Sequence, residues 1–139
     1  MPEHGDDTDL RLAVMRLARR IRSMQADDAV TDSQRSVLFA LERTGPISLG
    51  ALSEQERVTP PSMNRTVGAL VEAGLVTRSS APDDGRKVIL ALSESGLEFV
   101  AETRRRRDAW FSTRLDQLEP AERKVLERSA AVLRKLADS

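Results

Sequence analysis

Two short polar stretches carry most of the side chains suited to recognising another molecule. The first, Pro-Pro-Ser-Met-Asn-Arg, spans residues 60–65. An arginine can offer two parallel N–H donors to guanine, an asparagine can pair with adenine, and a serine at a helix N-terminus can bind phosphate. These residue types indicate a surface that could contact nucleic-acid bases, although an ordinary solvated helix face has a similar composition. The candidate contacts are Pro61, Ser62, Asn64 and Arg65.

The second stretch, Ala-Pro-Asp-Asp-Gly-Arg-Lys, spans residues 81–87. An Asp-Gly pair between strands is typical of a hairpin turn, because glycine tolerates positive φ. Arg86 and Lys87 would lie near the tip, and arginine suits the negative potential of a narrow minor groove. Asp84 could accept a hydrogen bond from the Arg86 guanidinium and fix its direction. The alternative is a polar turn with a surface ion pair worth about 0–1 kcal/mol.

Other arginines allow two interpretations each. Arg78 ends the run of residues before the turn and is predicted either to contact phosphate or to form a structural ion pair. Four consecutive arginines occupy positions 104–107. On a helix they would spread around the whole circumference. We therefore interpret this run as a solvated helix face paired with nearby carboxylates rather than as a nucleic-acid tract.

The composition argues against an enzyme, a metal site or a cofactor. The 139 residues include no cysteine and one histidine, His4, in the polar N-terminal stretch. Thiolate zinc sites and histidine-based catalysis are therefore not expected, and no glycine-rich phosphate loop is present. The 22 basic residues balance 22 acidic ones, so no global basic field indicates a partner. No apolar run approaches the roughly 18 residues that span a bilayer, and no signal peptide is evident, so we expect no membrane partner and a cytoplasmic protein.

Apolar spacing and capping residues predict six helices. The first would begin at Asp9, after an acidic leader at residues 3–9, and end near residues 26–28. We expect the leader to be disordered, although it could pair with arginines of the first helix in a partner subunit. The later helices would begin at Thr31 or Asp32, at Ser48, at Thr59, at Ser93 and around residues 118–120.

The fourth helix would carry the stretch at residues 60–65. Two prolines fit its first turn, where an N–H group would have no partner, and Gly74 would end it. With Met63 pointing to the core, a rotation of about 100° per residue turns Arg65 to the opposite side. Together with the short helix before it, this helix forms a helix-turn-helix over residues 46–74.

Strand-forming residues at 75–78 and 88–92 flank the charged turn. A two-stranded hairpin that follows a helix-turn-helix makes a winged helix-turn-helix. The predicted fold class is therefore mainly α with a small β-hairpin, with a winged helix-turn-helix lobe and a helical region.

The last helix carries a broad apolar stripe. Leu118, Val125 and Val132 recur every seven residues, and further leucines widen the stripe beyond what one neighbouring helix covers. We interpret this surface as a dimer seam, with an intrachain helical pair that closes onto the lobe as the alternative.

Three segments and the C-terminal helical pair resemble the MarR family of bacterial transcriptional regulators. The segments are VTDSQRSVLFAL, ISLGALSEQERVTPPSMNRTVGALVEAGLVTR and PDDGRKVILALSESG. The resemblance implies an obligate homodimer. It assigns residues 1–28 to a dimerisation helix with a mobile leader, residues 29–96 to a DNA-binding lobe, and residues 97–139 to dimerisation helices.

The resemblance also implies roles for single residues. The Asp84-x-Arg86 pair matches a family motif whose arginine enters the minor groove. Family members often have threonine at the position of Asn64 and a polar residue at that of Gly85, so the base preference stays open. A ligand pocket for small aromatic or anionic molecules is implied where the dimerisation helices meet the lobe. Its lining could include Phe39, Trp110 and Phe111, for which core packing is the alternative.

We therefore predict a dimeric regulator that binds a pseudopalindromic site in double-stranded DNA. It would act as a repressor that a small molecule relieves. Because a fold does not fix a function, the alternative is a winged-helix protein-interaction module without sequence-specific DNA binding.

Overall fold

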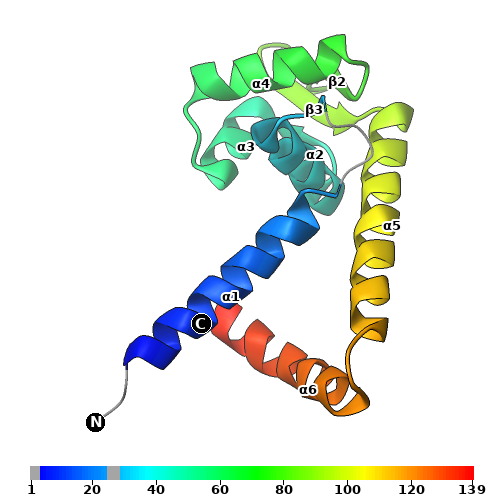
Figure 1. Ribbon diagram of the computed structural model, residues 1–139. Coiled ribbons are helices and arrows are strands. Elements are labelled where there is room, and N and C mark those ends of the chain that lie inside the picture. The colour runs from blue at the N-terminus through cyan, green and yellow to red at the C-terminus, as the bar shows by residue number, and fades with distance from the viewer. Residues whose placement is uncertain (1–3, 25–28) are drawn as a thin grey trace. The chain divides into compact units, whose positions relative to one another are not determined.

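The computed structural model describes residues 4–24 and 29–139 (Figure 1). In these ranges the chain forms six helices and a three-stranded antiparallel sheet, which confirms the mainly helical class. The described residues fall into two compact units: a helical unit, residues 4–24 and 105–139, and a lobe, residues 29–104. The elements are α1 (His4–Arg22), α2 (Asp32–Thr44), β1 (Ile47–Ser48), α3 (Leu49–Glu56), α4 (Pro60–Glu72), β2 (Val76–Ser80), β3 (Val88–Leu92), α5 (Glu94–Asp116) and α6 (Pro120–Ala137).

One aliphatic cluster holds the lobe together. Leu38 of α2, Leu52 of α3 and Leu90 of β3 are each 0 % exposed. Burying a side chain of this size contributes roughly 1.5–3 kcal/mol, so the cluster joins the helices firmly to the sheet. Its other members include Val37, Leu41, Met63, Val67, Leu70, Val76, Phe99 and Val100.

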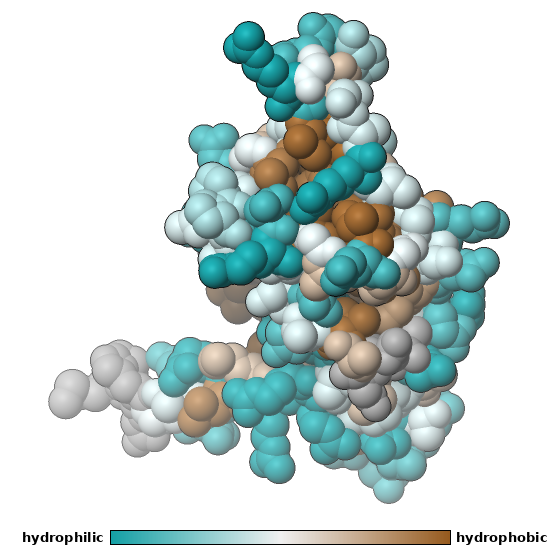
Figure 2. Space-filling view, turned by 90° about the horizontal axis from the view of Figure 1, so that it is seen from above, coloured by the Kyte–Doolittle hydropathy of each residue, from teal (hydrophilic) through white to brown (hydrophobic). Residues whose placement is uncertain are grey.

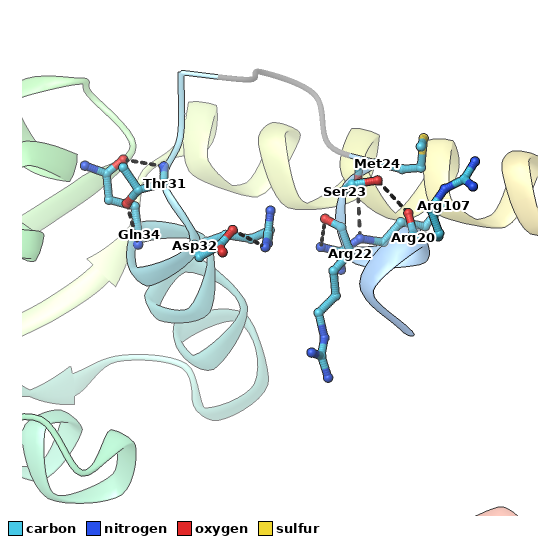
Figure 3. A network of polar contacts seen from close by, with 9 residues as sticks. Arg20, Arg22, Ser23, Met24, Thr31, Asp32, Gln34 and Arg107 are labelled. Atoms are coloured by element: carbon cyan, nitrogen blue, oxygen red, sulfur yellow. Dashed lines mark hydrogen bonds and ion pairs between the residues drawn. The ribbon is translucent and has the colours of Figure 1, made fainter. Parts of the chain in front are cut away.

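Of the two predicted starts of α2, the structure has Thr31 as the N-cap. The Thr31 hydroxyl accepts a hydrogen bond from the backbone N–H of Gln34 over 3.2 Å, and the Gln34 side chain accepts one from the Thr31 N–H over 3.1 Å. Figure 3 shows this reciprocal capping box. At the other end, Gly45 has φ +73° and its N–H donates to the Leu41 carbonyl.

The predicted ends of α4 are also confirmed. The Thr59 hydroxyl accepts a hydrogen bond from the Ser62 N–H, and two prolines occupy the first turn. Just beyond the helix, Gly74 has φ +77°, the left-handed conformation that glycine adopts easily. The second helix of the helix-turn-helix therefore has two defined ends.

The sheet contains one strand more than the predicted hairpin. Its order is β1-β3-β2, with Val76 paired to Leu92 and Ser80 paired to Val88 across the hairpin. In β1, Ile47 pairs with Leu90. The sequence did not reveal β1, because two residues are too short to show an alternating pattern.

A close contact joins the end of α4 to the start of α5. The Ser93 hydroxyl donates to the Gly74 carbonyl over 2.6 Å and accepts from the Gly96 N–H over 3.0 Å. The Ser93 N–H donates to the Leu75 carbonyl. Gly96 passes so near this carbonyl that an added Cβ would lie 2.1 Å from its oxygen. A side chain at position 96 is therefore incompatible with this junction.

The predicted start of α1 was wrong. The helix begins at His4, so Asp6, Asp7 and Asp9 lie within it rather than before it. Carboxylates in the first turn stabilise a helix because they complement its N-terminal partial charge. Glu3 and the predicted helix end at residues 26–28 lie outside the described residues.

In the helical unit, α5 contacts the end of α1. The Arg107 guanidinium donates to the Met24 carbonyl over 3.2 Å and to the Arg22 carbonyl over 3.5 Å (Figure 3). A cation at a helix C-terminus satisfies carbonyls that lack helical partners. The Arg20 and Arg114 guanidinium carbons lie 5.3 and 4.8 Å from the centroid of Trp110.

The turn into α6 carries an ionic cluster. The Asp116 carboxylate accepts a hydrogen bond from Arg123 over 2.6 Å, and Glu127 accepts a second over 3.2 Å. These bonds raise the pKa of Arg123, with the Asp116 bond as the larger cause.

Within the described ranges, every helix is too short or too polar to span a bilayer.

We expect Gly96→Ala to lower the free energy of unfolding by about 3 kcal/mol, because the added Cβ would overlap the Leu75 carbonyl. Gly85→Ala is the matched control. Its φ is not positive, and no heavy atom lies within 4 Å of an added Cβ, so we expect a change within about 0.5 kcal/mol. Urea unfolding at one protein concentration measures both. Equal stability of the two variants would contradict the close approach at Gly96.

Candidate nucleic-acid interface

The outward face of α4 follows from its buried face. Met63, Val67 and Leu70 are at most 1 % exposed and point into the lobe. The helical rotation of about 100° per residue then turns Asn64 and Arg65 outward, and both are exposed. Figure 2 views the molecule from the side on which α4 lies in Figure 1, and long hydrophilic side chains cross that surface.

Near the N-terminus of α4, three predicted contacts lie together. Pro61 is exposed and Ser62 is partly exposed. The Arg65 guanidinium donates to the Ser62 hydroxyl over 3.1 Å. In the part of the chain that the structure describes, Arg65 has no carboxylate within ion-pair distance. The neutral hydroxyl therefore orients the guanidinium without neutralising its charge, which stays available to an anionic partner.

Arg78 joins β2 to α4. Its Nη2 donates to the Asn64 Oδ1 over 3.0 Å and to the Asn64 backbone carbonyl over 3.3 Å. The sequence left a phosphate contact or a structural ion pair open. Among residues 4–24 and 29–139, no carboxylate forms an ion pair with Arg78. The contact with a neutral amide therefore leaves the arginine charge uncompensated.

The hydrogen bonding and the backbone conformation at the tip of the hairpin differ from those predicted. Asp84 Oδ1 accepts a hydrogen bond from the backbone N–H of Arg86 over 3.0 Å. The prediction that Asp84 holds the Arg86 guanidinium was wrong for this structure, because the aspartate makes a local turn with the backbone two residues on. Gly85 does not have positive φ, so the expected glycine-dependent hairpin turn is absent there. The loop closes instead through the Ala81 N–H, which donates to the Lys87 carbonyl.

This turn leaves two cations on the surface. Arg86 and Lys87 are exposed, and neither forms an ion pair with the described residues. Both also line a cavity of about 280 Å³ with Ser48, Leu49 and Gly50. The part of the wing that leads into β3 therefore lies beside the start of α3.

The arginine run at 104–107 makes contacts beyond its own helix. Arg104 forms an ion pair with Glu42 of α2 over 3.2 Å, and its guanidinium carbon lies 5.9 Å from the centroid of the Phe39 ring. We predicted a solvated face paired with nearby carboxylates. The contacts of Arg104 with α2 and of Arg107 with the end of α1 were not predicted. Two members of this run help to position helices.

The structure divides the residues of the predicted ligand pocket. Phe39 belongs to the lobe, whereas Trp110 and Phe111 belong to the helical unit. All three are partly buried. Trp110 lines a cavity of about 590 Å³ in the helical unit, together with Leu12, Ala13, Leu17, Arg16, Arg20, Arg114 and Asp9. In the described ranges, no group of three or more potential metal ligands is present.

Comparisons with known proteins identify the family. Residues 30–88 match the MarR family. An HTH-type transcriptional regulator from Mycobacterium bovis is 43% identical over 131 residues, which cover 94% of this chain and 92% of the relative. The chain belongs to the MarR family of transcriptional regulators.

Solved MarR-like structures share the fold. The crystal structure of RV1404 from Mycobacterium tuberculosis is 30% identical, has a TM-score of 0.86, and the match covers 97% of this chain and 94% of RV1404. FabT from Streptococcus pneumoniae, solved in complex with DNA, is 14% identical with a TM-score of 0.72, and the match covers 98% of each chain. At that identity the FabT comparison establishes the fold alone.

The Asp84 contact predicts a measurable change at the wing of this MarR-family protein. Asp84→Ala removes the acceptor of the Arg86 N–H, so we expect that amide to exchange its proton about 2–10 times faster, as loss of about 0.5–1.5 kcal/mol implies. Asp84→Asn removes the same charge but keeps an acceptor, so exchange should stay within about twofold of wild type. Amide exchange followed by NMR separates the two. Equal acceleration in both variants would show that the charge, not the hydrogen bond, orders the turn.

Proposed function

We propose that this MarR-family protein is a dimeric, sequence-specific regulator that binds double-stranded DNA and acts as a repressor. The observation that carries the proposal is the polar and cationic surface opposite the core of the lobe. It comprises the start of α4, Arg78 and the wing tip. On this surface Arg65, Arg78 and Arg86 have no carboxylate partner among the described residues.

The start of α4 suits the major groove. An α-helix fits this groove, which is about 12 Å wide, and the outward side chains in the first two turns of α4 are two prolines, small polar residues and one arginine. The Arg65 guanidinium would break its hydrogen bond with Ser62 and donate two hydrogen bonds to guanine. The Ser62 hydroxyl and Pro61 would approach the phosphates and fix the register of the helix.

The wing suits the adjacent minor groove. Its tip offers Arg86 and Lys87 as exposed cations. Asp84 holds the backbone at this tip by accepting a hydrogen bond from the Arg86 N–H. Arginine is favoured in a narrow minor groove because the negative potential is enhanced there. FabT, which has the same fold, was solved in complex with DNA, and this supports DNA as the class of partner.

Dimerisation would use the apolar faces of the helical unit. The 18 residues of α6 include none that is buried. Such continuous apolar surface on a water-exposed helix indicates a protein partner. A second copy of the chain supplies a matching surface, and a two-fold axis would place the two lobes on half-sites about 34 Å apart. The exposed apolar residues are Leu10, Leu12, Val14, Met15 and Leu17 of α1 and Val125, Leu126, Val132, Leu133 and Leu136 of α6.

Repression would follow from occupation of DNA that polymerase needs. A small molecule would relieve it by binding more tightly to a dimer whose lobes do not match the spacing of the operator. Within the helical unit, the cavity beside Trp110 has the mixed lining that such a ligand requires. The helical unit would then serve dimerisation and regulation, and the lobe would serve DNA binding.

We expect Arg86→Ala to weaken binding to the operator and to lower the slope of log affinity against log salt by about 0.9, because one phosphate-neutralising cation is lost. The operator would first be isolated by genomic selection with the intact protein. Arg134→Ala in α6 is the control, since it removes the same charge from the helical unit. An unchanged salt slope for Arg86→Ala would refute the role of the wing. Intact dimers that enrich no DNA sites would favour the protein-interaction alternative.

We expect the double change Val125→Asp and Val132→Asp to produce monomers at micromolar concentration, because it buries two carboxylates in the proposed apolar interface. Sedimentation velocity measures the outcome. Ala131→Asp is the control, since it adds a carboxylate to the opposite face of α6 and should leave the dimer intact. A dimeric double variant would place the interface elsewhere.

A further inference from the structure

The hydrogen bonds between Arg78 and Asn64 connect the sheet to the outward face of α4. Side chains alternate along a strand, so Arg78 shares its face of β2 with Val76, which is 3 % exposed and packs in the core. That direction brings its guanidinium to the side chain of Asn64 at 3.0 Å and to the backbone carbonyl of Asn64 at 3.3 Å. The arginine therefore donates two hydrogen bonds to one residue of α4.

The contact lies beside a glycine one turn later in α4. Gly68 lies four residues after Asn64, on the same side of the helix. A Cβ added at Gly68 would lie 3.8 Å from Arg78 Nη2, so the guanidinium passes directly over this position. A longer side chain at position 68 would compete with the arginine for the same space.

The bond determines which atoms Asn64 can offer. An asparagine amide carries one acceptor oxygen and two N–H donors, whereas a guanidinium carries donors only. The oxygen must therefore face Arg78, and the NH₂ group remains for a partner. The usual pairing of asparagine with adenine needs both ends of the amide, with the oxygen accepting from the adenine N6 amino group. The oxygen keeps a second lone pair, but the cation beside it repels the positive edge of an amino group.

We propose that Arg78 is a positioning residue that determines base preference through Asn64. With its oxygen held, Asn64 acts as a donor and selects the keto bases, guanine (O6 and N7) and thymine (O4). It disfavours cytosine, which presents an amino group in the major groove, and adenine, whose single N7 acceptor lies beside an amino group. Without Arg78, the free amide regains the two-point pairing with adenine. This inference rests on the proposed function, since it names the base chemistry of the same surface.

The experiment measures base preference with the full-length protein. Competition binding on the selected operator, with all four base pairs at each position, first locates the position where Asn64→Ala loses its preference. At that position the wild type should prefer a keto base on the contacted strand. Arg78→Met, which keeps the aliphatic stem without donors, should shift the ratio of keto base to adenine by about tenfold towards adenine. Arg78→Met in the Asn64→Ala background should cause no shift.

The controls separate positioning from charge and from folding. Arg78→Lys keeps the charge. If Arg78 only contacted a phosphate, lysine would retain that contact. Arg78→Met would then weaken binding to all sequences equally, without a shift in base preference. That outcome would overturn the inference while leaving DNA binding intact. A wild-type preference for adenine at the Asn64 position would also overturn it. Absence of any selected operator for the wild type would instead refute the proposed function. Far-UV circular dichroism and urea unfolding confirm that each compared variant is folded.

Discussion

The buried face of α4 is the constraint on which the recognition surface depends. Met63, Val67 and Leu70 are almost fully buried, and their burial fixes the rotation of the helix. Since successive residues turn by about 100°, aliphatic packing sets the side of the helix on which Asn64 and Arg65 lie. Thr59 and Gly74 define where the helix begins and ends, so its outward residues have a fixed position in the lobe as well as a fixed direction.

Around this helix, the lobe holds its cations with neutral partners. Arg65 donates to a hydroxyl and Arg78 to an amide, while Asp84 bonds the backbone at the tip and leaves the Arg86 guanidinium free of an ion pair in the described chain. A neutral partner orients a cation without cancelling its charge. The chain has equal numbers of basic and acidic residues, so attraction for DNA must come from such local placement rather than from net charge.

The sequence predicted features that depend on local patterns and missed those that depend on tertiary contacts. Caps at Thr31 and Thr59 have short signatures, and the buried stripe of α4 has helical spacing, so these were found. The partner of Arg78 lies 14 residues away on another element, and no local pattern identifies it. Asp84 could bond either the backbone or the guanidinium of Arg86, and only the geometry of the turn distinguishes the two. The acidic residues before Leu10 predict a leader, although carboxylates also suit the first turn of a helix.

The central claim is that α4 and the wing of each lobe contact adjacent grooves of one operator. Hydroxyl-radical footprinting of the intact protein on a genomically selected operator tests this most directly. We expect two equivalent half-sites about 34 Å apart, each protected on one face of the duplex, with minor-groove protection beside a major-groove contact. Uniform protection along the duplex, or protection without flanking minor-groove segments, would contradict it.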